Sequence, residues 1–123
     1  MKPIYLDNNA TTRVDPAVVD AMLPFFTEHF GNASSIHAFG SEVGKALKKA
    51  RSQVQALLGA EHDSEIIFTS CGTESDSTAI LSALKAQPDR NTVITTNVEH
   101  PAILTLCDWL EKEGYIVHKL KVD

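Results

Sequence analysis

The spacing of apolar residues predicts one long helix in the first half of the chain. Five of them follow one another at steps of four and three residues, which places them on one face of a helix: Val43, Leu47, Ala50, Val54 and Leu57. Mostly polar and charged residues take the other faces. The pattern predicts a helix over residues 41–58, and Gly59 then supplies a common C-terminal stop.

A shorter helix is predicted before the long one. Asp15 suits the N-cap position, and Pro16 suits the first helical position. The apolar residues of this helix form one face: Val18, Met22, Phe25 and Phe26. Pro24 lies within that pattern and is expected to kink the helix or end it early. Small and polar residues predict loops at 7–12 and 30–35.

In the second half, short apolar or β-branched runs alternate with helical patterns. The predicted order is strand 65–69, helix 73–86, turn 87–91, strand 92–96, loop 97–100, helix 101–113 and strand 115–120. Such alternation indicates a parallel sheet with right-handed crossovers. We therefore expect an α/β fold, with an N-terminal helical arm over residues 1–60 and a βαβαβ start of a larger domain over residues 61–123. Three parallel strands would leave an open sheet edge, so the sequence is expected to be the N-terminal portion of that domain.

Two loops of this predicted sheet carry candidate chemistry. Around Gly72 a strand passes through a tight turn into a helix, and such a turn aims backbone N–H groups at one point, which suits a phosphate. Ligands of parallel sheets bind outside the carboxyl ends of the strands, so His100 is expected to line the same crevice. Its ring could lie flat against a planar ligand, although a helix-capping or solvent-exposed histidine is the alternative reading.

The common nucleotide motifs are missing. A dinucleotide fingerprint needs three spaced glycines, and only Gly72 is present at the turn. A P-loop needs Gly-Lys followed by Ser or Thr, whereas Gly44-Lys45 is followed by Ala46 inside the predicted long helix. The phosphate expected at Gly72 is therefore not assigned to a nucleotide.

Composition limits the classes of partner. The 123 residues carry a formal net charge of −5, which argues against a general binder of nucleic acids or anionic membranes. No apolar run approaches the roughly 18 residues of a membrane span, and Asp7 comes too early for a signal peptide, so a cytoplasmic location is expected. Cys71 and Cys107 are far apart in sequence, and the histidines show no metal-ligand spacing, so neither a disulfide framework nor a metal site is expected.

Four segments together resemble a known family. They are residues 6–12 (LDNNATT), 30–37 (FGNASSIH), 68–76 (FTSCGTESD) and 99–102 (EHPA). In this order and spacing they resemble the N-terminal third of the cysteine desulfurases, which are class V, fold-type I pyridoxal-phosphate enzymes. The resemblance is strongest to the NifS type, which is associated with iron–sulfur cluster supply for nitrogen fixation.

The resemblance implies roles for three residues. Gly72 and Thr73 match positions that hold the phosphate of pyridoxal 5'-phosphate, and His100 matches a catalytic histidine that stacks on the pyridine ring and assists proton transfer. Residues 61–123 would then begin the large cofactor-binding domain. The implied reaction converts L-cysteine to L-alanine and an enzyme-bound persulfide, in a homodimer that passes sulfur to an iron–sulfur scaffold protein.

The covalent chemistry is expected to lie elsewhere in such an enzyme. The family's Schiff-base lysine and persulfide cysteine match later sequence, so this chain alone is expected not to turn over cysteine. Cys71 is expected to be a bystander and Cys107 a core residue. Thr73 and Asp76 have the spacing of a capping box, and Glu74 is expected to serve capping and the helix dipole. Two alternatives stay open: another class V enzyme, such as a selenocysteine lyase or an aminotransferase, and a small non-catalytic binding module.

Overall fold

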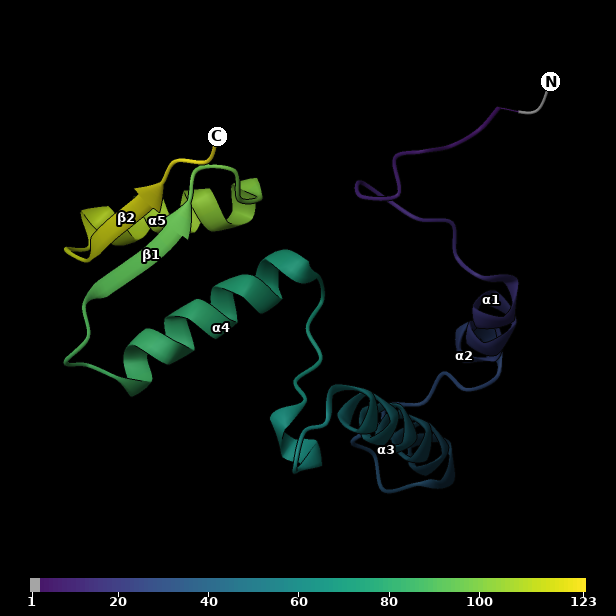
Figure 1. Cartoon of the computed structure of the whole chain (residues 1–123). Coiled ribbons are helices and arrows are strands. Elements are labelled where there is room, and N and C mark those ends of the chain that lie inside the picture. Colours follow the sequence, from purple (N-terminus) through teal and green to yellow (C-terminus); the bar gives the residue numbers. More distant parts are fainter. Residues whose placement is uncertain (1–2) are drawn as a thin grey trace. The chain divides into compact units, whose positions relative to one another are not determined.

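The computed structural model describes residues 3–123, which form two compact units (Figure 1). The first unit is Met1–Ile66 and the second is Ile67–Asp123. The first contains only helices, whereas the second combines helices with a small sheet. The sequence-based division into an arm over 1–60 and a domain over 61–123 stays a prediction.

Three α-helices and one short 3-10 helix make up the first unit: α1 (Pro16–Met22), α2 (Pro24–Thr27), α3 (Ala38–Leu58) and η1 (Asp63–Glu65). The Asp15 carboxylate accepts the N–H of Ala17 at 2.8 Å, which caps α1 as predicted. Pro24 ends α1 and opens α2, so the predicted interruption is confirmed.

The long helix α3 begins three residues earlier than its apolar stripe predicts. His37 is its N-cap, because Nδ1 of its ring accepts the N–H of Gly40 at 3.4 Å. Gly40 is buried, and a Cβ there would come within 2.5 Å of the Asn32 carbonyl oxygen, so only glycine fits against the preceding loop. At the other end Gly59 adopts φ 70°, the left-handed conformation expected of a helix stop.

The second unit contains α4 (Gly72–Ala86), β1 (Thr92–Thr96), α5 (Pro101–Lys112) and β2 (Ile116–Leu120). The strands pair in parallel, with a register that runs from Thr92 opposite Ile116 to Thr96 opposite Leu120. Helix α5 connects them and contacts both β2 and α4 (Figure 1). Its inner face supplies Cys107 and Leu110, which are 1% and 0% exposed. The expected α/β class with a parallel sheet is confirmed.

The prediction of a first strand, over residues 65–69, is wrong. Residues 63–65 form the turn η1, and no strand follows them before α4. Local hydrogen bonds explain the difference: the Glu65 carboxylate accepts the His62 N–H at 2.8 Å, and the Arg51 guanidinium donates to the Ile66 carbonyl. The Ile66 carbonyl is thus bonded to a side chain and not to a neighbouring strand. Within residues 3–123 the sheet therefore has two strands, not three.

Candidate functional site

The turn before α4 presents a set of backbone donors. Cys71 is the N-cap in an extended conformation, and α4 begins at Gly72. The first bond of the α-helical ladder runs from the Ser75 N–H to the Cys71 carbonyl at 3.1 Å. The N–H groups of Gly72, Thr73 and Glu74 precede that bond, so they lie at the positive end of the helix without an intrahelical acceptor.

Hydrogen bonds from side chains brace this turn on both sides. One Glu74 carboxylate oxygen accepts both the Ser70 N–H, at 2.7 Å, and the Ser70 hydroxyl, at 2.6 Å. The Thr69 hydroxyl donates to the Cys71 carbonyl at 3.1 Å and lies 2.6 Å from the Ser75 hydroxyl. Because the Thr69 proton is committed to Cys71, the Ser75 hydroxyl donates to Thr69. We call these four residues, Thr69, Ser70, Glu74 and Ser75, the turn clamp.

The predicted capping box of Thr73 and Asp76 is wrong. It required Thr73 to be the N-cap, but the helix begins one residue before Thr73. The Glu74 carboxylate instead accepts the N–H of Ser70, which lies before the N-cap Cys71, and α4 has no side-chain cap hydrogen bond. The expectation that Glu74 serves capping is therefore not confirmed.

Two ionisable groups at this turn have shifted pKa values. The hydroxyl and then the N–H of Ser70 lower the pKa of Glu74, because both donate to the charged carboxylate. The Glu74 N–H is the main cause that lowers the pKa of the exposed Cys71 thiol, because it stabilises the thiolate. Negative charge is thus favoured in front of α4.

His100 is the N-cap of α5. Its Nδ1 accepts the Ala102 N–H at 3.2 Å, and Pro101 occupies the first helical position. In the neutral ring the proton therefore lies on Nε2. The preceding loop is held by a 3.0 Å bond from the Thr96 hydroxyl to the Glu99 carboxylate. The His100 side chain therefore caps α5, which is the alternative that the sequence left open, and it does so through one edge of its ring.

Thr73 and His100 line the same groove, between the contacting helices α4 and α5, whereas Gly72 is not part of its lining. The groove is open and has a volume of about 570 Å³. Helix α4 contributes Thr73 and Ser77; α5 contributes Pro101, Ala102, Thr105, Leu106 and Trp109, and His100 lies at its start. The lining of the groove begins at Thr73, one residue after Gly72. A Cβ added at Gly72 would meet no atom within 4 Å. The space in front of the turn is therefore open to a ligand.

The donor set suits a phosphorylated planar molecule. Backbone N–H groups at a helix start, with a threonine hydroxyl beside them, bind phosphate oxygens. An imidazole and the apolar surface of Leu106 and Trp109 offer contact to a ring. Sequence reasoning missed the turn clamp, Ser77 and Trp109. A serine four residues before a glutamate at a helix start was the available signal for the Ser70–Glu74 part.

The remaining candidates lie outside this groove. Cys107 is buried on α5, and burial raises the pKa of its thiol, so its predicted core position is confirmed. Among residues 3–123, no three histidine, cysteine, aspartate or glutamate side chains are grouped so that they could hold a metal ion. In the same range no helix is both long and apolar enough to cross a membrane.

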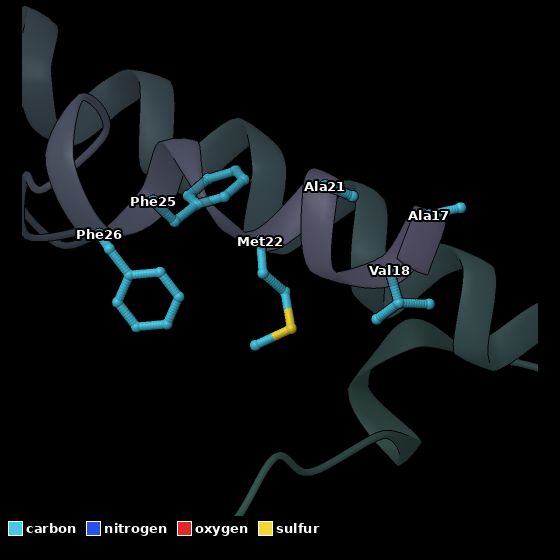
Figure 2. Close-up of a pocket in the computed structure, with 6 residues that line it drawn as sticks. All are labelled: Ala17, Val18, Ala21, Met22, Phe25 and Phe26. Carbon is cyan, nitrogen blue, oxygen red and sulfur yellow. The ribbon is translucent and has the colours of Figure 1, made fainter. Parts of the chain in front are cut away.

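A second hollow lies on the first unit and is wholly apolar. Its volume is about 460 Å³, and its lining is Ala17, Val18, Ala21, Met22, Phe25 and Phe26. Figure 2 shows Val18, Met22 and Phe26 projecting to the same side of α1 and α2. No lining residue can bind a charge or transfer a proton, so this hollow is not a catalytic site.

The sequence matches the family model described as Aminotransferase class-V over residues 4–123. The chain is 77% identical, over 123 residues, to the cysteine desulfurase NifS of Azotobacter vinelandii, and covers 31% of that protein. It is 68% identical to a cysteine desulfurase of Gluconacetobacter diazotrophicus, again over the whole chain and 31% of the relative. The chain thus spans about a third of the length of these curated relatives.

Solved structures share the fold. A NifS-like protein superposes with a TM-score of 0.86 at 40% identity, over 95% of this chain and 32% of that protein. A structure described as SspA in complex with cysteine has a TM-score of 0.84 at 35% identity, over 94% of this chain and 33% of the other.

Proposed function

Since the chain belongs to the class V aminotransferase family, whose cofactor is pyridoxal 5'-phosphate, we propose that it is the cofactor-phosphate-binding part of a cysteine desulfurase. The observation that carries the proposal is the 77% identity to the NifS cysteine desulfurase over the whole chain. The parent enzyme would convert L-cysteine to L-alanine and leave the sulfur as a persulfide on an enzyme cysteine.

The groove would hold the cofactor between α4 and α5. The N–H groups of Gly72 and Thr73, with the Thr73 hydroxyl, would bind the phosphate, where the α4 dipole favours negative charge. His100 would contact the ring, and its cap on α5 holds the imidazole in one orientation. Once bound, the cofactor supplies an electron sink for the substrate amino acid.

In the neutral ring Nδ1 of His100 accepts the Ala102 N–H and Nε2 carries the proton, so the capped side chain can donate a hydrogen bond at Nε2. The ring would take up a proton for acid–base transfer when Nδ1 leaves the cap and is protonated there. In the overall reaction the substrate C–S bond breaks, the sulfur forms an S–S bond with a cysteine thiolate, and the carbon gains a proton. The resemblance assigns that thiolate and the Schiff-base lysine to sequence not matched in this chain, so these residues alone would not turn over cysteine.

The proposal also covers the partners of the protein and its location in the cell. We propose a homodimer that gives its sulfur to an iron–sulfur scaffold protein, in the service of nitrogen fixation. The NifS name of the relative from Azotobacter vinelandii supports this assignment. A location in the cytoplasm, without nucleic-acid or membrane partners, agrees with the net charge of −5.

An assay of the complete gene product tests the proposal. We expect L-cysteine to yield equal amounts of L-alanine and reducible sulfur when the protein is loaded with pyridoxal 5'-phosphate. His100→Ala should lower turnover by at least about 100-fold, the lower end of a general acid–base contribution, and change the absorbance of the bound cofactor. Turnover of L-selenocysteine alone, or amino transfer without sulfur release, would instead support another class V activity.

A further inference from the structure

The turn clamp ties the segment before α4 to the first turn of that helix. Its bonds run from Ser70 to Glu74 and from Ser75 through Thr69 to Cys71. The first set joins Ser70, outside the helix, to Glu74 in its first turn, and the second joins Ser75 in the first turn, through Thr69 outside the helix, to the N-cap Cys71. Every residue from 69 to 75 is therefore either a member of the clamp or enclosed by it, and Gly72 and Thr73 are enclosed.

The clamp also decides which donors are left for an anion. The Ser70 hydroxyl and N–H both point at one Glu74 oxygen, so neither is offered to the groove. The N–H groups of Gly72 and Thr73 precede the first helical hydrogen bond and have no intrahelical acceptor, and the Thr73 N–H also faces the Cys71 thiol, whose pKa it helps to lower. The Thr73 side chain lines the groove. The donors that remain are those at the position where the proposed phosphate binds.

Holding the turn in advance has an energetic benefit for binding. A flexible turn must be ordered when the ligand binds, and that ordering subtracts from the affinity. Hydrogen bonds to a charged carboxylate are among the stronger ones in proteins, so the bonds to Glu74 are suited to hold the turn without a ligand. Glu74 is in the charged form that these bonds require, because Ser70 lowers the pKa of its carboxyl group.

We propose that Glu74 is a positioning residue for the cofactor phosphate: through Ser70 it preorganises the donors of Gly72 and Thr73. This inference rests on the proposed function, since it takes the bound anion to be the phosphate of pyridoxal 5'-phosphate. Glu74 itself does not touch the phosphate, because its oxygen is occupied by Ser70.

The test compares affinities for pyridoxal 5'-phosphate and for pyridoxal, which lacks the phosphate, in the apo form of the complete protein. Glu74→Ala should weaken binding of pyridoxal 5'-phosphate about tenfold, the equivalent of one lost charge-assisted hydrogen bond, and leave pyridoxal binding unchanged. Glu74→Gln should keep affinity within about threefold of the unsubstituted protein, because one amide oxygen can accept both Ser70 donors. Glu113→Ala, an exposed glutamate at the other end of α5, is the matched control and should change neither affinity.

Amide hydrogen exchange gives a second readout that needs no cofactor. Exchange at residues 71–75 should accelerate in Glu74→Ala and return towards the original rate in Glu74→Gln. If Glu74→Ala does not fold, Ser70→Ala removes one of the two donors and should shift both readouts in the same direction. Equal pyridoxal 5'-phosphate affinities in the unsubstituted protein and in Glu74→Ala or Ser70→Ala would overturn the role of Glu74. If the unsubstituted protein does not bind pyridoxal 5'-phosphate at all, the proposed function itself fails, and the inference with it.

Discussion

Two histidines begin helices in the same way. His37 and His100 each use Nδ1 to accept a backbone N–H near the start of the following helix, α3 or α5. For His100 the sequence left a choice between capping and contact with a planar ligand. The geometry makes the two compatible, because the cap uses one nitrogen at the ring edge and leaves the ring faces uncommitted.

The lowered pKa of Cys71 leads to a prediction about the reactivity of its thiol. Because that pKa is lowered, a larger fraction of the thiol is ionised at a given pH, and alkylation should begin at lower pH than for an ordinary cysteine. The rate of reaction with iodoacetamide, followed by mass spectrometry, should have a midpoint below the reference value for an unperturbed, exposed cysteine. Cys107 is the internal control and should react slowly at every pH, since it is buried and its pKa is raised.

A midpoint for Cys71 at or above the reference value would contradict the stabilisation of the thiolate by the Glu74 N–H. It would leave the phosphate role of Gly72 untouched, because that role depends on other donors. The measurement therefore separates the electrostatics of the turn from the identity of its ligand.

At the scale of elements, local signals predicted most of what formed. Asp15, Pro24 and Gly59 start or stop helices where the sequence indicated, and β1 has the predicted bounds. The expected strand over 65–69 did not form. Its sequence pattern carries no information about the side chains that compete for hydrogen bonds with a neighbouring strand. Glu65 bonds backward to His62, and Arg51 reaches the Ile66 carbonyl from 15 positions away.

Gly40 gives a prediction at this scale. A Cβ there would meet the Asn32 carbonyl at 2.5 Å, so Gly40→Ala should force the loop before α3 apart. We expect it to lower the free energy of unfolding by about 1–3 kcal/mol, the usual cost of overpacking. Urea unfolding followed by circular dichroism measures the change.

Gly44→Ala is the matched control in the same helix. Its Cβ would lie 3.1 Å from the Ala33 carbonyl, a milder contact. Alanine is also preferred over glycine inside a helix by up to about 1 kcal/mol, which offsets that contact. Equal destabilisation by the two substitutions would show that the close approach at Gly40 is not what fixes the start of α3.

The sequence predicted that Thr73 and His100 share one crevice, but for a reason that is partly wrong. It placed both at the ends of parallel strands, whereas the strand expected before Thr73 did not form and the contact between α4 and α5 brings the two residues together. The turn clamp was not predicted, since it depends on the directions of Ser70 and Glu74 side chains. Those directions depend on where the helix begins, which is Gly72 and not Thr73.

At the scale of the whole molecule, the chain corresponds to part of the length of its relatives. It spans about a third of its curated relatives, at 31% of the NifS protein of Azotobacter vinelandii. Its second unit has a two-stranded sheet, and Ile94 and Leu120 on the strands are 67% and 53% exposed. The groove of Thr73 and His100 is complete within that unit, so the proposed cofactor contacts do not depend on how the two units are arranged.

The most direct test of the account is a crystal structure of the complete protein with pyridoxal 5'-phosphate. We predict phosphate oxygens at about 2.7–3.2 Å from the N–H nitrogens of Gly72 and Thr73, and the His100 ring facing the pyridine ring. A phosphate bound away from the start of α4, or a His100 ring turned away from the cofactor, would contradict the account.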